Sequence, residues 1–165
     1  MGAVSATFPA APLDRMARLV TASVWGLAVV FAAVGLVMVG AGPTWPGVLL
    51  LIVGVLLAVM SWSYRLREPL SYAIEDRAVS IDRRSAATRR FEGSVTRVRR
   101  GALGWRVAGD GGVYGYLGRF RAEGRTVHAF VTDRKRVVLL EAGETGLAIS
   151  PADPDSFVAE VGRGT

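Results

Sequence analysis

Two apolar runs, LVTASVWGLAVVFAAVGLVMVG at residues 19–40 and PGVLLLIVGVLLAVMSWSY at residues 46–64, decide the fold of this 165-residue chain. Neither run contains a charged residue, and each is close to the ~20 residues that a helix needs to cross a bilayer core. A helix satisfies its own backbone hydrogen bonds, which lipid cannot do. Only the uncharged, turn-rich residues 41–45 separate the two runs. We therefore predict a transmembrane helical hairpin over residues 19–64.

The charges beside the hairpin predict its orientation. Arg15 and Arg18 precede the first run, Arg65 and Arg67 follow the second, and the connecting loop carries no base. Because basic flanks stay on the cytoplasmic side, we expect both termini in the cytoplasm. A cleaved signal peptide is the alternative for the first run, although such signals usually have only about 7–15 apolar residues. Residues 65–165 remain inside under either interpretation.

Small residues recur at helical spacing within the runs: Ala22 and Gly26, Ala28 and Ala32, Gly54 and Ala58. This spacing allows helix backbones to approach closely. It fits packing of the two helices on each other, which we favour, and it also fits dimerisation. Ion and proton pathways leave ionisable residues inside the membrane. Their absence from both runs argues against transport.

The rest of the composition narrows the remaining possibilities. Residues 1–18 show no helical period and contain two prolines, so we predict a flexible tail there. The chain has no cysteine, which excludes disulfides, thiolate nucleophiles and cysteine-based metal sites. The net charge of +6 favours an anionic surface such as a cytoplasmic leaflet. Nearly all of the bases are arginine, however, a bias that a GC-rich genome alone would produce.

From residue 70 the pattern changes to the alternation that is typical of β-strands. We predict strands near residues 71–75, 79–81, 88–91, 115–121, 126–132, 136–141 and 147–149. The first two form a hairpin around a turn at Asp76-Arg77. About seven short strands with frequent turns predict an antiparallel sheet that curls into a small barrel or sandwich.

A short helix follows the last strand. Ser150 is the predicted N-cap and Pro151 the first helical residue. Phe157, Val158 and Val161 then fall on one side of the helix. The predicted fold class is an α+β membrane protein, with a transmembrane hairpin followed by a bent β-domain over residues 65–165 that this helix caps.

Several segments of the domain match a known pattern. They are Tyr72-Ala-Ile-Glu-Asp-Arg with Val79 and Ile81, Gly115-Tyr-Leu-Gly-Arg-Phe120, Phe130-Val-Thr132, Val137 to Leu140, and Ile149-Ser-Pro-Ala-Asp-Pro154 with Phe157. Through these segments residues 70–162 resemble the bacterial pleckstrin-homology-like (PH-like) domains. The Ile149-Ser-Pro ending is the most specific of them.

The resemblance carries its own expectations. It implies a bent seven-stranded sheet capped by a helix, and usually no catalysis. Two membrane helices before such a domain also look like a recurring arrangement in bacterial membrane proteins, which implies the inner (plasma) membrane. The basic loop of phosphoinositide-binding relatives cannot be placed on this sequence residue by residue, so we carry over no ligand residues.

The sequence offers no catalytic or metal-binding constellation. His128 is the only histidine and lies in a predicted strand, so we interpret it as a strand-face or partly buried side chain. No Gly-x-Ser-x-Gly elbow occurs. The glycine-rich run at residues 109–112, with Gly115 and Gly118, lies among strands and lacks a following Gly-Lys-Ser/Thr. We interpret it as a hairpin turn and bulge, and we predict no catalytic residue, no cofactor and no metal ion.

Three arginine pairs follow the hairpin, at residues 83–84, 89–90 and 99–100. A base held near an anionic membrane surface is worth ~1 kcal/mol, and residues 61–68 alone link the end of the second apolar run to the first strand. We therefore single out Arg83, Arg84, Arg89 and Arg90 as candidate contacts for lipid headgroups. The alternative is that these arginines are simply solvated.

We expect a non-enzymatic integral membrane protein that uses its cytoplasmic domain for docking. The partner would be the lipid bilayer itself, another protein or a second copy of the chain, and an exposed sheet edge is able to accept a peptide strand. The alternative is an accessory subunit that stabilises a larger membrane enzyme or transporter. We expect no nucleic-acid partner, because the sequence has no basic helix, zinc pattern or aromatic-rich sheet motif.

Overall fold

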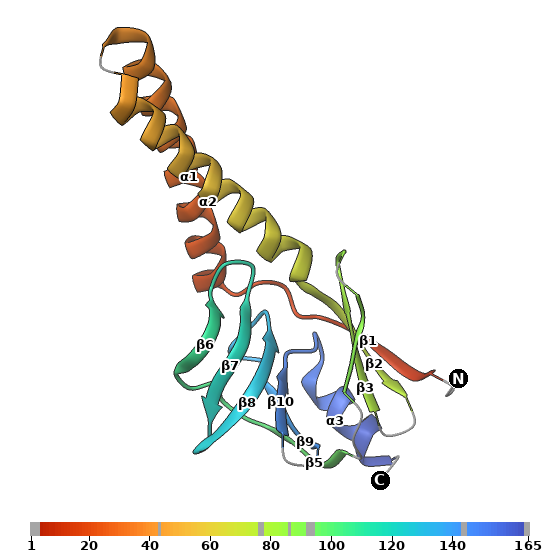
Figure 1. Ribbon diagram of the computed structural model, residues 1–165. Coiled ribbons are helices and arrows are strands. Elements are labelled where there is room, and N and C mark those ends of the chain that lie inside the picture. The colour runs from red at the N-terminus through yellow and green to blue at the C-terminus, as the bar shows by residue number, and fades with distance from the viewer. Residues whose placement is uncertain are drawn as a thin grey trace.

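The computed structural model describes residues 4–42, 44–75, 78–85, 87–91, 95–142 and 145–163. Two long helices form a stem that rises from one end of a β-rich domain (Figure 1). Helix α1 spans Arg15–Ala41 and helix α2 spans Thr44–Arg67. The predicted helical hairpin is therefore confirmed, and both helices extend beyond their apolar runs towards the domain.

The two helices of the stem pack on each other through small residues. A Cβ added to Gly54 would lie 2.9 Å from the carbonyl oxygen of Ala28 and 3.0 Å from the amide nitrogen of Ala32. A Cβ added to Gly35 would lie 2.7 Å from the carbonyl oxygen of Gly47. The helices approach this closely because these positions carry no larger side chain.

Both stem helices have the composition of membrane spans. In the most apolar window of each helix, only 11% and 17% of the residues are buried. A core helix of a soluble protein buries most of its residues, whereas these helices expose large apolar side chains along their length, among them Leu27, Val30, Val37, Leu49 and Leu56. The stem is accordingly a pair of candidate membrane spans.

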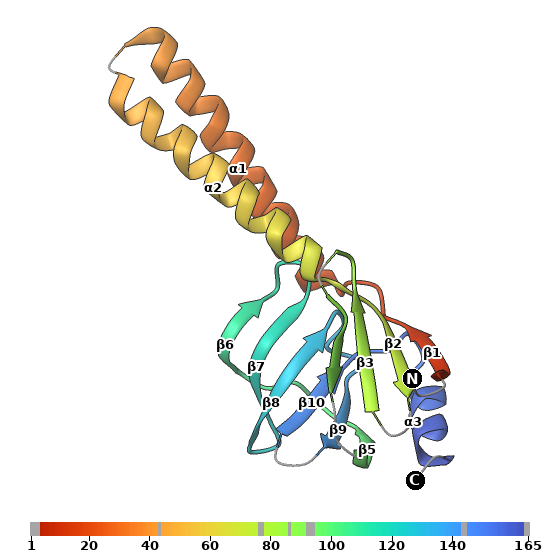
Figure 2. The same ribbon diagram turned by 45° about the vertical axis from the view of Figure 1, so that its right-hand side comes forward.

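The domain contains two sheets, with ten strands in the part of the chain that the structure describes. The four-stranded sheet has the order β1-β2-β3-β4, formed by Val4–Pro9, Pro69–Glu75, Ala78–Arg83 and Arg89–Phe91. The six-stranded sheet has the order β5-β9-β10-β8-β7-β6. Its strands are, along the chain, Val95–Arg100 (β5), Arg106–Gly111 (β6), Tyr116–Ala122 (β7), Arg125–Val131 (β8), Val138–Ala142 (β9) and Thr145–Ile149 (β10). Figure 2 shows the two sheets side by side below the stem.

The predicted bent β-domain is confirmed, with corrections in its detail. The two sheets do not close into a barrel, and β10 pairs with β8 in parallel rather than antiparallel. The first predicted hairpin is present as β2 and β3, although its turn at Asp76-Arg77 lies outside the described residues. Strands β5 and β6 were not predicted, and β6 overlaps the glycine-rich run at residues 109–112.

The prediction of a flexible tail over residues 1–18 is wrong for Val4–Pro9. This segment is strand β1 and pairs antiparallel with β2. The strands β1 and β2 lie directly before α1 and directly after α2. The helical hairpin therefore brings its own two flanks together, and their backbones pair at the edge of the four-stranded sheet.

The main core lies between the two sheets, where helix α3 (Pro154–Arg163) closes one side. Tyr72 and Ile81 come from the four-stranded sheet, Leu140 from the six-stranded sheet and Phe157 from α3, and all of them are fully buried. Val161 of α3 joins the same cluster. The predicted apolar side of the C-terminal helix is therefore confirmed.

The predicted start of this helix is wrong by three residues. The Asp153 carboxylate accepts hydrogen bonds from the backbone N–H groups of Asp155 (3.2 Å) and Ser156 (3.1 Å), so Asp153 is the N-cap. Ser150 is instead fully buried, and its hydroxyl accepts from the N–H of Thr132 at 2.8 Å. Pro151 forms an isolated bridge with the N-terminal segment. The helix starts later than predicted because Asp153 supplies the N-cap, while the Ser150 hydroxyl is occupied by Thr132.

The first turns of α1 pack against the domain. Asp14 caps the helix by accepting from the N–H of Ala17 at 2.7 Å, and its other carboxylate oxygen accepts from the Tyr116 hydroxyl at 3.2 Å. Ala17 is fully buried in a second apolar cluster on the outer face of the six-stranded sheet. Further along α1, the Thr21 hydroxyl accepts from the N–H of Tyr114 at 3.0 Å. The base of the stem is thus built into the domain.

Candidate anion-binding pocket at the base of the stem

The last turn of α2 lies beside the end of strand β3. The N–H of Arg84 donates to the carbonyl oxygen of Glu68 at 3.1 Å, and the N–H of Ser85 donates to that of Leu66 at 3.2 Å. These bonds run from the segment after β3 to the end of α2. They hold Arg83, the last residue of β3, close to the junction between stem and domain.

This junction borders a pocket with a volume of about 290 Å³, which we call the stem pocket. Helix α2 and strands β3 and β4 line one side, and strands β6, β7 and β8 line the other. The lining residues are Tyr64, Arg67, Arg83, Arg89, Gly109, Asp110, Leu117, Gly118, His128 and Phe130. The volume lies at the lower end of the ~300–1,000 Å³ that small-molecule sites occupy.

Two glycines form part of the pocket lining without contributing a side chain. Gly109 of β6 and Gly118 of β7 are cross-strand partners, and their φ angles are +111° and +129°. A Cβ added to Gly118 would lie 2.4 Å from the carbonyl oxygen of Ala108. Neither position accommodates a side chain, so the pocket is bounded there by backbone alone.

Three guanidinium groups from three different elements line the stem pocket: Arg67 of α2, Arg83 of β3 and Arg89 of β4. Burial lowers the pKa of Arg83, and the positive charges of Arg89 and Arg67 lower it further. Within the described ranges, no carboxylate forms an ion pair with any of the three. Their mutual repulsion is uncompensated by ion pairs, and a bound anion would relieve it.

Contacts around the pocket hold two of these arginines in place. The Arg83 guanidinium donates through Nε to the carbonyl oxygen of Ala87 at 3.1 Å. The Arg89 guanidinium lies over two aromatic rings, 5.7 Å from the centroid of Phe91 and 5.9 Å from that of Phe130. Stacking of this kind orders an arginine without neutralising its charge. Both cations are therefore positioned while their charge remains available to a ligand.

His128 lies on β8 beside these arginines, half-buried, as predicted for a strand-face histidine. Burial lowers its pKa, and the charges of Arg89 and Arg119 lower it further. These effects favour the neutral form of the ring over the imidazolium. Among the described residues, no group of three or more His, Asp and Glu side chains is arranged to hold a metal ion.

Asp110 is the acidic group of the pocket. Burial raises its pKa to about 6, against the smaller, opposite effects of hydrogen bonds from the backbones of Gly111 and Val113 and of the charge on Arg106. Its Oδ2 atom is buried without a hydrogen-bond partner. A buried polar atom left unsatisfied costs ~1–3 kcal/mol. Asp110 thus brings an unused hydrogen-bonding position to a lining that it shares with Arg67, Arg83 and Arg89.

The structure separates the four arginines that were singled out from the sequence. Arg83 and Arg89 line the stem pocket, whereas Arg84 pairs with Glu68 at 3.3 Å outside it. Arg90 follows Arg89 directly in β4. Because successive strand residues point to opposite faces, Arg90 points away from the pocket. The structure thus brings Arg83 and Arg89 together in the pocket and leaves Arg84 and Arg90 outside it.

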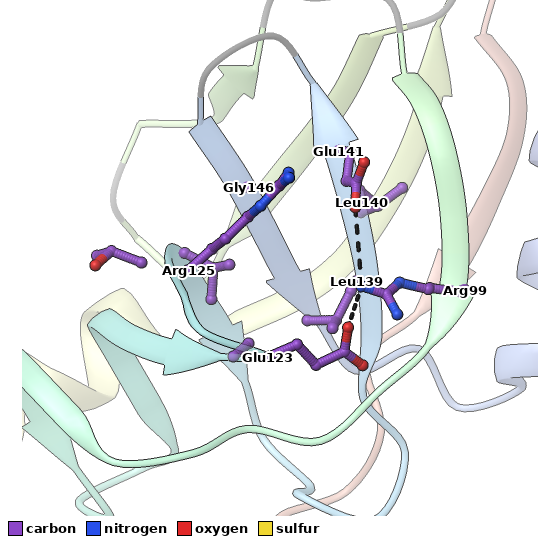
Figure 3. Close-up of a pocket in the computed structure, with 10 residues that line it drawn as sticks. Arg99, Glu123, Arg125, Leu139, Leu140, Glu141 and Gly146 are labelled. Carbon is purple, nitrogen blue, oxygen red and sulfur yellow. Dashed lines mark ion pairs between the residues drawn. The ribbon is translucent and has the colours of Figure 1, made fainter.

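The third arginine pair lies at the other end of the domain, beside a second pocket (Figure 3). There Arg99 points between Glu123 and Glu141 and forms an ion pair with each, at 3.8 Å in the case of Glu141. Arg125 also lines this pocket. Two arginines and two glutamates cancel in formal charge, so this pocket has no net attraction for an anion.

A shallow groove beside the start of α1 adds to the positive charge at the base of the stem. Its lining includes four basic residues, which are Arg15, Arg18, Arg134 and Lys135, and two acidic ones, which are Asp14 and Asp133. Bases therefore gather at the base of the stem beside both α1 and α2. The far end of the stem, at residues 41–45, carries none.

Sequence reasoning missed two members of the stem pocket. In the sequence, Arg67 was used only to predict the orientation of the hairpin. Asp110 belonged to the glycine-rich run that was interpreted as a hairpin turn and bulge. The pocket combines segments around residues 64–67, 83–89, 109–118 and 128–130. No local pattern joins them. The one available signal was an acid flanked by glycines between two strands.

A comparison with known families bears on the fold of the domain. Residues 91–164 match the model of the bacterial PH domain family. The match begins at the end of β4 and covers the six-stranded sheet and α3, and it confirms the resemblance inferred from the sequence. The stem and strands β1 to β3 precede the matched PH domain residues. No curated protein and no solved structure matches the chain.

Proposed function

We propose that this chain is a non-enzymatic protein of the bacterial inner membrane whose PH domain docks on the anionic cytoplasmic leaflet beside its own stem. The observation that carries the proposal is the gathering of Arg67, Arg83 and Arg89, without carboxylate partners among the described residues, where α2 enters the domain. Each base held near an anionic surface contributes ~1 kcal/mol. The stem would keep the domain at the surface while these bases select its orientation.

The distribution of charges and aromatic rings supports a stem that spans the membrane with both termini in the cytoplasm. Arg15 and Arg18 precede the apolar part of α1, and Arg65 and Arg67 end α2, as the positive-inside rule requires for a cytoplasmic domain. The Arg65 guanidinium lies 5.4 Å from the centroid of the Trp62 ring. Tryptophan prefers the interface between headgroups and hydrocarbon, and this preference supports a stem pocket at headgroup level.

Docking of a protein segment is the second candidate function, and the exposed edge of the six-stranded sheet favours it. Strand β6 is the last strand of that sheet. Just before it and within it, Trp105 and Val107 are 73% and 51% exposed. An edge strand with exposed apolar side chains is able to pair with an extended segment of another protein. An accessory subunit of a larger membrane complex would use such an edge.

The absence of cysteine from the chain allows a direct test of docking. A single cysteine introduced by Ala87→Cys, next to the stem pocket, would carry a fluorophore in the full chain reconstituted into nanodiscs. We expect quenching by headgroup-labelled lipid to be stronger in nanodiscs that contain anionic lipid than in purely zwitterionic ones. The triple variant Arg67→Gln, Arg83→Gln, Arg89→Gln should lose this difference.

The matched control removes charge at the far end of the domain. The variant Arg121→Gln with Arg125→Gln should retain the difference between anionic and zwitterionic nanodiscs. Equal quenching in both lipids for the unmodified chain would contradict docking on the leaflet. If crosslinking in native membranes then captured one stoichiometric protein through the Trp105 edge, the accessory-subunit function would replace it.

A further inference from the structure

We propose that the stem pocket binds the phosphate monoester headgroup of a lipid in the surrounding leaflet, the headgroup of phosphatidic acid being the simplest of this kind. The inference rests on the proposed docking at the membrane, because it names the ligand of that same surface. It adds a selectivity that general attraction to anionic lipid does not have. Four properties of the pocket support this inference: its charge, its size, its position beside the stem, and the buried Oδ2 atom of Asp110 that lacks a hydrogen-bond partner.

The charge of the pocket matches a dianion better than a monoanion. A guanidinium is a planar fork of N–H donors that pairs with phosphate oxygens in a bidentate manner. Arg67 and Arg89 line the pocket with such forks, whereas Arg83 donates through Nε and Nη2 to the carbonyl oxygen of Ala87 and adds its Nη1 donors and its charge. A phosphate monoester carries about −1.5 to −2 charges at pH 7, whereas the diester phosphate of other headgroups carries only one. Three cations without carboxylate partners in the described parts of the chain therefore favour the monoester.

The size of the pocket favours a headgroup with little beyond the phosphate. About 290 Å³ is at the lower limit of the ~300–1,000 Å³ typical of ligand sites. On one side the pocket is bounded by the backbone of Gly109 and Gly118, which cannot move apart without breaking the β6–β7 pair. A bare phosphate fits this space with less displacement than a phosphate that carries a sugar or polyol.

The position of the pocket identifies a lipid rather than a soluble phosphate as the source. Tyr64 and Arg67, which line it, belong to the last turn of α2. The apolar run of α2 ends at Tyr64. A lipid beside α2 consequently carries its phosphate to the level of the pocket, and its acyl chains lie along the apolar face of the helix.

Asp110 adds a directional hydrogen bond that a simple cationic patch lacks. Its buried Oδ2 has no partner among the described residues, and as a carboxylate it would repel a phosphate. In the protonated form it donates one O–H to a phosphate oxygen and satisfies that atom. The raised pKa of Asp110 makes this protonation accessible near neutral pH, and a bound anion raises it further. Ligand and proton should therefore bind together.

The charged and titratable groups around Asp110, on its own strand and in the pocket lining, determine how this linkage must be tested. Arg106 lies on its own strand, Arg67 and Tyr64 on α2, Arg83 and Arg89 on β3 and β4, and His128 on β8. Of these, His128 has an ordinary pKa of about 6.5, and burial and the charges of Arg89 and Arg119 lower it here. The variant Asp110→Asn keeps a neutral donor at every pH and should abolish most of the pH dependence. The variant His128→Gln should abolish only the smaller part of the pH dependence that Asp110→Asn leaves.

The experiment counts lipids bound to the full chain by native mass spectrometry after release from nanodiscs. The nanodiscs hold zwitterionic lipid with either phosphatidic acid or phosphatidylglycerol at matched surface charge. We expect retention of phosphatidic acid to exceed that of phosphatidylglycerol about tenfold, which corresponds to about 1.4 kcal/mol. Arg83→Gln with Arg89→Gln should abolish the preference, and Arg121→Gln with Arg125→Gln should keep it, provided that all variants unfold at the temperature of the unmodified chain.

Each other outcome overturns the inference in a distinguishable way. Equal retention of the two lipids, still dependent on Arg83 and Arg89, refutes a monoester site and leaves docking on anionic lipid intact. Equal retention of anionic and zwitterionic lipid refutes both. Glycerol 3-phosphate and inorganic phosphate serve as soluble probes. If either displaces phosphatidic acid at concentrations comparable to the lipid, the ligand is a free phosphate and the lipid source is wrong.

Discussion

The indole N–H of Trp25 donates to the hydroxyl oxygen of Tyr114 at 3.1 Å, across 89 positions of sequence. Trp25 lies on α1, and Tyr114 lies in the turn between β6 and β7. One turn earlier on α1, Thr21 accepts from the N–H of Tyr114 and contacts the carbonyl oxygen of Gly112 at 3.5 Å. The β6–β7 turn is thus tied to the stem, and with it the strand that carries Asp110.

These contacts predict a local effect of mutation in the stem. Thr21→Val removes the acceptor of the Tyr114 N–H, and Trp25→Phe removes the donor to its hydroxyl, each at a cost of ~0.5–1.5 kcal/mol. We expect amide hydrogen exchange of residues 112–115 to accelerate in both variants while exchange in β8 and β9 stays unchanged. Thr44→Val, at the far end of the stem, is the matched control. Uniform acceleration over the whole domain would show global destabilisation instead of a local tie.

The close crossing of β6 and β7 predicts a strong effect of a single methyl group. Gly118 has a φ of +129°, and a Cβ there would lie 2.4 Å from a backbone oxygen. Gly124, in the β7–β8 turn, also has a positive φ of +83° but has nothing within 4 Å of its Cβ position. Gly124→Ala should cost only the ~1–2 kcal/mol of left-handed backbone, and Gly118→Ala should cost more. Chemical unfolding of both variants in the same detergent would measure the difference, and equal costs would contradict it.

The sequence predicted the elements whose signal is local. The stem followed from uncharged apolar runs, and β7, β8 and β9 from alternation around a buried face. Strand β1 escaped prediction because its partner β2 is separated from it by the whole stem. Strand β6 was not predicted because its first four residues are all exposed and it contains two glycines. Its sequence therefore shows no alternation of apolar and polar residues.

The candidate site was predictable only in part, for a related reason. The arginine pairs were visible as charge, but the sequence could not show that Arg83 and Arg89 converge while Arg84 and Arg90 do not. That selection depends on strand alternation and on the bond between the segment after β3 and the end of α2. Asp110 became significant only through its burial and its unsatisfied oxygen. Such properties belong to the assembled fold.

The raised pKa of Asp110 predicts how stability depends on pH. Burial raises this pKa from the ordinary value of 3.8 to about 6, so the folded state holds the proton more tightly than the unfolded state. The associated stabilisation is complete at pH values below 3.8 and is lost as the pH rises through about 6. Asp110→Asn, which stays neutral, should therefore be more stable than the unmodified chain at pH 8 and about equally stable at pH 4.

Thermal unfolding in zwitterionic detergent, where no anionic lipid occupies the pocket, would measure this difference across the pH range. Asp155→Asn, an exposed carboxylate paired with Arg100 at 3.5 Å, provides the control, and its melting temperature should not show the same gain at high pH. A stability difference between Asp110→Asn and the unmodified chain that is independent of pH would show that folding does not raise the pKa of Asp110.

His128 offers a spectroscopic reading of the stem pocket, because it is the only histidine of the chain and its ring gives one resolved signal if purification avoids a histidine tag. Its pKa lies below the ordinary value of about 6.5, owing first to burial and then to the charges of Arg89 and Arg119. Removing one of these charges by Arg89→Gln or Arg119→Gln should raise the pKa in the absence of ligand.

Binding of an anionic headgroup should raise the same pKa, since the anion offsets the positive charge that disfavours the imidazolium. NMR titration of the ring carbon and its proton in nanodiscs, with and without phosphatidic acid, would measure it. Arg119 does not line the pocket, so Arg119→Gln should keep the response to lipid. The variant Arg83→Gln with Arg89→Gln should lose it. An imidazole pKa that is insensitive to phosphatidic acid in the unmodified chain would place the lipid elsewhere, because no anion could bind between Arg83 and Arg89 without altering the charge that His128 experiences.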